Sequence, residues 1–165
     1  PFDNINRSDL VILTKSNLYR NNTYLINKIE KMKLPYIFSK IIIDNYMITI
    51  SGEKIKTNLI NGENIYIMSA LGDSKGFEET INKTGAIIKG HKRFSDHYNY
   101  NTKDIQKIEK YAIKSNAKFL ITTEKDMVKI KNYNGKIPLC SLKIYFIVKQ
   151  KDELESYLNK INKND

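Results

Sequence analysis

An acid and an imidazole stand side by side in the segment Phe94–Asp104, at Asp96 and His97. The pair follows an apolar stretch and precedes a helical pattern, so it is expected in a loop between a strand and a helix. An imidazole there can orient a carboxylate, accept a proton near neutral pH, or bind a phosphate when charged. His97 is therefore the best catalytic candidate in the chain. The alternative is that Asp96 and His97 only hydrogen-bond the turn and cap the following helix.

A second segment of polar residues, Thr123–Lys129, also follows an apolar stretch. Thr123 is placed to cap a short helix, and Asp126, three residues later, is placed to return the bond to the backbone. Lys125 and Lys129 lie one helical turn apart on one side of that helix. They face either an anion or only water, and both alternatives stay open.

The third segment, Ala70–Phe77, contains two glycines and leads from a strand through a tight turn into a helix. Backbone N–H groups at such a helix N-terminus can receive a phosphate. Residues 85–92 nearly match a phosphate-binding loop, but that loop needs Lys directly after its second Gly, whereas His91 follows Gly90. The apolar centre of residues 85–92 predicts a strand instead.

Strands and helices alternate along most of the chain. Strands are expected at residues 9–14, 64–70, 86–94, 118–122 and 139–148, and helices at 22–33, 74–84, 102–115, 124–130 and 152–162. This alternation predicts an α/β fold with a mostly parallel sheet and flanking helices. Ligands of open α/β sheets bind beyond the carboxyl ends of the strands, and each of the three segments follows a predicted strand.

The middle of the chain has a different pattern, with β-rich runs at residues 36–43, 46–51 and 54–59. Asp44-Asn45 and Gly52-Glu53 separate these runs with the spacing of hairpin turns. We therefore expect a small antiparallel β-ribbon at about residues 36–60. It would be inserted in a single α/β domain that spans residues 1–165.

The composition limits the classes of partner and site. Lys and Arg number 28 against 18 Asp and Glu, a net charge of +10, which favours anionic partners such as phosphorylated sugars, nucleic acid or acidic lipids. A Lys-rich genome explains the charge equally well. No apolar run is long enough to span a membrane, and no secretion signal is seen. With one cysteine, Cys140, and two histidines, neither an internal disulfide nor a metal site is predicted, which fits a reducing cytoplasm.

Taken in order, the three segments resemble the carboxyl-terminal half of the tetraacyldisaccharide 4'-kinase family, and the resemblance covers the whole chain. The family's Gly-x-Gly-Asn-Pro-x-x-Phe stretch is similar to Ala70–Phe77, and its Asp-His-His-x-Tyr-x-x-x-Asp motif is similar to Asp96–Asp104. Its Thr-Glu-Lys-Asp-x-Val-Lys motif, the most specific of them, is similar to Thr123–Lys129. Tyr98 stands where the family usually has a second His, which leaves His97 in the first position.

The resemblance implies a P-loop-kinase-like fold and transfer of the γ-phosphate of Mg-ATP to the 4'-hydroxyl of the lipid A disaccharide 1-phosphate precursor. The family acts at the cytoplasmic face of the bacterial inner membrane. By resemblance, His97 supports an upstream aspartate that activates the hydroxyl, while Asp96 fixes the turn. Lys125 and Lys129 would face the phosphates of the substrate or the nucleotide. From its position directly after the first predicted strand, and not from the resemblance, we also infer that Lys15 lays its stem along the adenine.

In the family, the phosphate-binding loop and the acidic magnesium motif lie upstream of the residues present here. ATP and Mg are therefore expected to be bound mainly by that part, and this chain alone is expected to be inactive. The expected partners are the acylated disaccharide phosphate and an anionic membrane surface, without nucleic acid.

Two alternatives to a kinase part stay open. The charge, eleven tyrosines and six phenylalanines suggest a basic nucleic-acid-binding module. Most of these aromatic residues lie in apolar periodic segments, where core packing accounts for them. The other alternative is a catalytically inactive relative that is retained for binding.

Overall fold

The structure, a computed structural model, describes residues 2–18 and 23–161. Its first elements are η1 (Phe2–Arg7), β1 (Val11–Leu13), α1 (Thr23–Lys31), β2 (Tyr36–Thr49), β3 (Lys54–Lys56) and η2 (Thr57–Ile60). Then follow β4 (Asn64–Ser69), α2 (Ser74–Asn82), β5 (Ile87–Arg93), α3 (Thr102–Lys114), β6 (Phe119–Thr123), α4 (Glu124–Met127), β7 (Leu139–Val148) and α5 (Lys151–Ile161). Asn22 and Asn162, at the expected ends of two helices, lie outside the described residues.

The chain forms two compact units, one within residues 1–42 and 145–165 and the other within residues 43–144. In the first unit, β1 pairs in parallel with the beginning of β2. The side-chain amide of Asn17 donates to the carbonyl of Ile41 and accepts from its N–H group, at 2.8 and 2.9 Å. This double hydrogen bond fixes the loop that follows β1.

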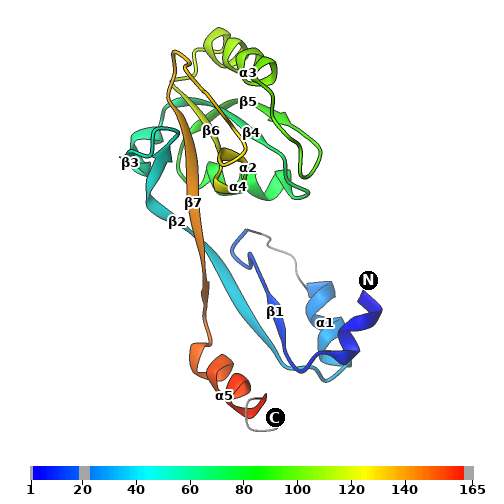
Figure 1. Ribbon diagram of the computed structural model, residues 1–165. Helices are drawn as coiled ribbons and strands as arrows, with labels where there is room; N and C mark the ends of the chain where they lie inside the picture. Colours follow the sequence, from blue (N-terminus) through cyan, green and yellow to red (C-terminus); the bar gives the residue numbers. More distant parts are fainter. Residues whose placement is uncertain (1, 19–22, 162–165) are drawn as a thin grey trace. The chain divides into compact units, whose positions relative to one another are not determined.

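The sheet has the strand order β1-β2-β7-β6-β4-β5, with β3 beside β2. β4 pairs in parallel with β5 and with β6, β6 pairs in parallel with β7, and β3 is antiparallel to β2. Within the second unit, α2 and α3 cover opposite faces of β4, β5 and β6 (Figure 1). The prediction of an α/β fold with a mostly parallel sheet, flanking helices and a small antiparallel ribbon is confirmed.

The side chains of β4 show why this strand needs a helix on each side. Ile65 and Ile67 belong to an apolar cluster that includes residues of α2, whereas Met68 belongs to one that includes residues of α3. Successive side chains of a strand point to opposite faces, so a strand that is apolar throughout is stable only when both faces are covered. This packing places the loops that follow β4, β5 and β6 at one edge of the sheet.

β2 runs without interruption through Asp44 and Asn45, so the hairpin turn predicted there is wrong. The carboxylate of Asp44 accepts a hydrogen bond from the amide of Tyr46 at 3.2 Å, and its carbonyl accepts one from the hydroxyl of Thr57 at 2.7 Å. Strands β3 and β7 both pair with β2. This pairing, which the local sequence does not encode, outweighs the turn preference of Asp and Asn.

Other differences from the expected elements are small. The second expected turn is present, at Gly52, whose positive φ of 88° suits glycine. The strand expected at residues 54–59 ends at Lys56, and the helix expected at residues 124–130 ends at Met127. That the whole chain is one domain with an inserted ribbon stays a prediction.

Candidate active site

Three loops of the second unit lie at the carboxyl ends of the parallel strands β4, β5 and β6 and contact one another. The amide of Ala70, directly after β4, donates a hydrogen bond to the carboxylate of Asp126 in α4, at 3.0 Å. A β-carbon built on Gly72 would lie 3.9 Å from the carboxylate of Asp96, in the loop after β5. The structure thus brings the three sequence segments together at the edge where open α/β sheets bind ligands.

The turn that carries Asp96 and His97 is stabilised by its own hydrogen bond, which the His97 amide donates to the Asp96 carboxylate at 3.0 Å. The side chain of His97 is 75% exposed, and its Nε2 lies 3.8 Å from Oδ2 of Asp96. Helix α3 is capped by Asn101 and Asp104, which form a reciprocal capping box. Of the alternative interpretation, the hydrogen bond within the turn is therefore confirmed, whereas the cap of the following helix by Asp96 and His97 is wrong. The imidazole of His97 is exposed.

The carboxylate of Asp96 also interacts with Lys125, whose Nζ lies 3.6 Å from Oδ1 of Asp96. Partial burial acts to raise the pKa of Asp96, but the charge of Lys125 and the hydrogen bond from the His97 amide outweigh it and lower the pKa. Asp96 is therefore ionised at neutral pH. This charge can hold both the turn and the ammonium group of Lys125.

Lys125 and Lys129 both extend toward the loop after β5. Nζ of Lys129 donates to the carbonyl of Tyr98 at 3.3 Å and lies 4.0 Å from Oδ1 of Asp126. The Lys129 side chain is only 21% exposed, whereas that of Lys125 is 46% exposed. Two cations are thus oriented beside the Asp96–His97 turn, which is an arrangement suited to binding an anion.

The interactions of Asp126 were only half expected from the sequence. Thr123 does cap α4, because its hydroxyl oxygen accepts from the amide of Asp126 at 3.1 Å. The expected return bond from the Asp126 carboxylate to the Thr123 backbone is wrong. The carboxylate instead accepts from the Ala70 amide and from the Thr123 hydroxyl. The local match to a capping box concealed this contact with a distant strand.

Lys15 belongs to the first unit, directly after β1, and has a left-handed backbone with φ 56°. The other four predicted site residues belong to the second unit. The place of Lys15 in nucleotide binding therefore stays a prediction.

His91 is part of a polar network near the ends of β4 and β5. In the sequence, its place after Gly90 served only to exclude a phosphate-binding loop. Its Nε2 lies 2.9 Å from the hydroxyl of Ser69, and its Nδ1 lies 3.0 Å from the carboxylate of Glu78. The guanidinium of Arg93 donates to the carboxylate of Glu78, and its Nε lies 3.2 Å from Nδ1 of His91. Burial lowers the pKa of His91, and hydrogen bonds from His91 and Arg93 lower the pKa of Glu78.

We expect the free energy of unfolding to decrease when the pH falls from about 7 to about 5. In the unfolded chain His91 binds a proton below its ordinary value of 6.5, whereas the folded protein resists that proton because the ring is buried. Glu78 lowers the free energy of unfolding further only when the pH falls below its ordinary pKa of 4.5, because its pKa is lowered in the folded protein. Denaturant unfolding at several pH values should show that the free energy of unfolding depends less steeply on pH in His91→Gln than in the wild type. Above about pH 7.5 the two proteins should have the same slope of free energy against pH. Identical slopes below pH 6.5 would contradict the role of His91 in this pH dependence.

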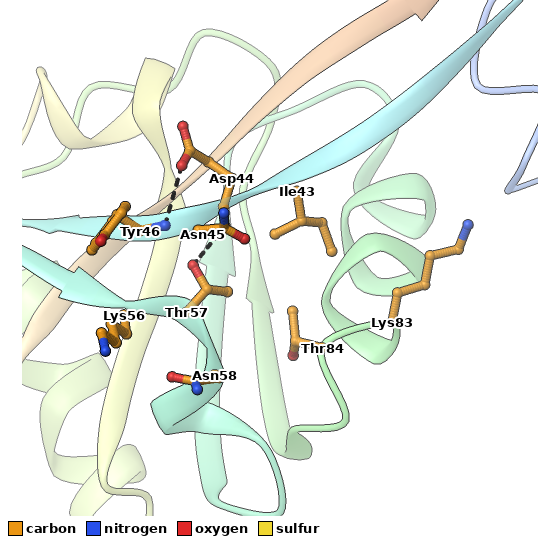
Figure 2. Close-up of a pocket in the computed structure, with 9 residues that line it drawn as sticks. All are labelled: Ile43, Asp44, Asn45, Tyr46, Lys56, Thr57, Asn58, Lys83 and Thr84. Carbon is orange, nitrogen blue, oxygen red and sulfur yellow. Dashed lines mark hydrogen bonds between the residues drawn. The ribbon is translucent and has the colours of Figure 1, made fainter.

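A pocket of about 450 Å³ lies elsewhere in the second unit (Figure 2). Its lining comes from β2, β3, η2 and the end of α2: Ile43, Asp44, Asn45, Tyr46, Lys56, Thr57, Asn58, Lys83 and Thr84. Asn58 precedes β4 and Thr84 precedes β5, so the pocket lies at the amino ends of these strands. None of the predicted site residues lines it. The chemistry of the three loops, rather than the volume of this pocket, marks the candidate site.

Residues 2–18 and 23–161 contain neither a cluster typical of a metal site nor a helix that could span a membrane. In this part of the chain, no three His, Cys, Asp or Glu side chains are grouped so that they would hold a metal ion. Among the helices described there, none is both long and apolar enough to cross a membrane.

Several bacterial proteins that are similar to this chain are tetraacyldisaccharide 4'-kinases. The tetraacyldisaccharide 4'-kinase of Desulfotalea psychrophila is 35% identical over 89 residues, which are 54% of this chain and 25% of the relative. The enzyme of the same name from Rickettsia rickettsii strain Sheila Smith is 32% identical over 133 residues, 81% of this chain and 36% of the relative. The chain thus spans about a quarter to a third of the length of these relatives.

The crystal structure of LpxK from Aquifex aeolicus in complex with ATP has a similar fold. The TM-score is 0.59 at 17% sequence identity, and the similarity covers 98% of this chain and 45% of that one. Identity this low bears on the fold alone. The match to the family described as Tetraacyldisaccharide-1-P 4'-kinase extends over residues 1–163. Because this match covers nearly the whole sequence, the chain belongs to the tetraacyldisaccharide-1-P 4'-kinase family.

Proposed function

We propose that this chain is the carboxyl-terminal part of a longer kinase that transfers the γ-phosphate of ATP to the 4'-hydroxyl of the lipid A disaccharide 1-phosphate precursor. The observation that supports this most is the contact between three loops that carry family-like motifs, at the carboxyl edge of one parallel sheet. Family membership supports the class of reaction. The match covers only 36% of the length of the Rickettsia rickettsii relative, which supports the proposal that the chain is one part of a longer kinase.

In this proposal His97 and Asp96 serve the attacking hydroxyl. Phosphoryl transfer depends mainly on positioning the nucleophile and on neutralising phosphate charge. The exposed imidazole of His97 hydrogen-bonds an aspartate from the rest of the kinase and keeps it ready to accept the hydroxyl proton. Asp96 keeps the turn in place through its bond with the His97 amide.

Lys125 and Lys129 bind phosphate groups of the nucleotide or of the lipid substrate. Both ammonium groups already lie beside the Asp96–His97 turn, so they need little reorganisation to meet an anion. Lys15 is proposed to contact the adenine through its aliphatic stem. ATP, when bound, supplies the phosphoryl group. Magnesium is proposed to be bound mainly by the part of the kinase upstream of these residues.

The kinase is proposed to act at the cytoplasmic face of the bacterial inner membrane, where its acylated substrate lies. The net charge of +10 favours contact with an anionic membrane surface. Nucleic acid is not proposed as a partner.

Replacement of the two lysines in the full-length kinase tests the phosphate-binding role. We expect Lys125→Met and Lys129→Met each to lower kcat/KM for phosphorylation of the disaccharide by about tenfold, because each removes one charge-assisted contact with phosphate. Lys110→Met, which removes the same charge from an exposed position on α3, is the matched control and should leave kcat/KM unchanged.

If kcat/KM in Lys125→Met and Lys129→Met equals that of Lys110→Met and of the wild type, the phosphate-binding role of the lysines is wrong. A full-length protein that forms no product, and that binds oligonucleotides with strong salt dependence, would contradict the kinase proposal in favour of the nucleic-acid alternative.

A further inference from the structure

Asp126 carries the most deeply buried carboxylate of the candidate site. Its side chain is 0% exposed, although it lies on the four-residue helix α4 next to the exposed Lys125. A buried carboxylate is unfavourable unless hydrogen bonds or a cation compensate for the lost hydration. The partners of its two oxygens therefore show what the residue does.

Oδ2 of Asp126 is fully engaged in holding two segments together. It accepts the amide N–H of Ala70 at 3.0 Å and the hydroxyl of Thr123 at 2.8 Å. Ala70 is the first residue after β4, so this oxygen ties the end of β4 to the helix that carries the two lysines. These bonds keep the carboxylate in one orientation.

Oδ1 of Asp126 is in a different situation. It is buried and accepts no hydrogen bond from the described residues, and the hydroxyl of Tyr100 is also buried without a hydrogen-bond partner there. The cation nearest to Oδ1 is Nζ of Lys129 at 4.0 Å. Burial raises the pKa of Tyr100 most, and the charge of the neighbouring Asp126 and an interaction between the two side chains raise it further, so the Tyr100 hydroxyl is neutral and Lys129 supplies the positive charge that faces Asp126.

The position of Lys129 follows from this charge. Its ammonium group is attracted by Oδ1 of Asp126 while it donates to the carbonyl of Tyr98, two residues from Asp96. A long lysine side chain with only a backbone carbonyl as partner would be free to turn into water. The buried carboxylate, itself fixed by Ala70 and Thr123, removes that freedom.

We propose that Asp126 is a positioning residue that holds the ammonium group of Lys129 beside the Asp96–His97 turn, ready to bind a phosphate group. That the ligand is a phosphate group rests on the proposed phosphoryl transfer. The contact between Asp126 and Lys129 is independent of that proposal. Asp126 itself touches neither substrate nor nucleotide.

The test is Asp126→Asn in the full-length kinase. The amide is nearly the same shape and keeps an oxygen for the Ala70 amide and the Thr123 hydroxyl, but it removes the charge that faces Lys129. We expect kcat/KM to fall by about tenfold, as in Lys129→Met, with the folded fraction unchanged. Glu124→Gln, which removes a carboxylate from an exposed position on the same helix, is the matched control.

A double variant shows whether Asp126 acts through Lys129. When Lys129→Met is already present, Asp126→Asn should cause less than about a twofold further loss, because the group that Asp126 orients is gone. If the two losses multiply instead, the two residues act independently and the proposal is wrong. Normal kcat/KM in the single variant Asp126→Asn would overturn it as well.

A measurement that does not use catalysis separates this inference from the proposed function. Acetylation of each lysine by a small amine-reactive reagent, followed by mass spectrometry, should be several-fold faster at Lys129 in Asp126→Asn than in the wild type. Lys110, which is exposed on α3, should react equally in both proteins. If the wild-type protein has no kinase activity, the proposed function is wrong. The labelling would still test the contact between Asp126 and Lys129. Unchanged labelling of Lys129 would overturn the positioning role.

Discussion

We expect the 165-residue chain by itself to form no phosphorylated disaccharide from ATP. A kinase of the P-loop type needs a glycine-rich loop with Lys and Ser or Thr after its last glycine, and this sequence contains no such loop. The described residues also contain no group of carboxylates that would hold a metal ion. A radiolabel assay with γ-labelled ATP and the acylated disaccharide phosphate, on chain cleared of contaminating kinase, measures this directly.

The matched control is a longer protein encoded by the same reading frame with the DNA upstream of this chain. If that region encodes a phosphate-binding loop, the longer protein should form product under conditions in which the chain alone forms none. Product from the pure chain would show that its own residues suffice for phosphoryl transfer. The division of the site between this chain and an upstream part would then be wrong.

The second large effect is expected for His97→Ala in the full-length kinase. kcat should fall by about 10²–10⁴-fold, with a smaller change in KM for the lipid, because a positioned general base or its orienting partner contributes this much to proton transfer. The imidazole is exposed beside the ionised Asp96, and α3 has its own cap at Asn101. A loss of helix capping therefore does not account for such an effect. Steady-state kinetics per folded active site give the measurement.

His91→Ala provides the contrast, because this histidine lies on β5, six residues before His97, and its side chain is buried in a network with Ser69 and Glu78. Its removal should lower thermal stability and the active fraction, while the remaining folded enzyme turns over normally. If His97→Ala shows this same pattern, with full kcat per folded site, the catalytic role of His97 is wrong. Asp96 and His97 would then only stabilise a turn.

The strands and helices of the second unit could be predicted because their signals are local. The apolar run of β4 and the helical spacing of Ile105, Ile108 and Ala112 in α3 depend on neighbours within a few residues, and those neighbours are in the sequence. The rule that ligands bind beyond the carboxyl ends of parallel strands then indicated the three loops. Their contacts in the structure follow from the strand order β6-β4-β5.

The turn expected at Asp44 shows where such local reasoning fails. Asp and Asn favour turns in isolation, but β2 continues through them because β3 and β7 pair with it. The identity of a strand's neighbours depends on segments far away in the chain. The strand expected at residues 54–59 likewise ends in the 3₁₀ helix η2, whose first residue, Thr57, donates its hydroxyl to the distant carbonyl of Asp44.

The residue types at the candidate site were determined by the sequence itself: an acid and an imidazole after one strand, and two lysines one turn apart after another. Only the tertiary structure decided what these side chains touch. The carboxylate of Asp126 bonds to the amide of Ala70, 56 positions away, as well as to the hydroxyl of Thr123 at the start of its own helix, and Lys125 reaches Asp96. The physical reason is that a hydrogen bond or ion pair acts over a few ångströms, and the order of strands in the sheet sets which distant residues come that close.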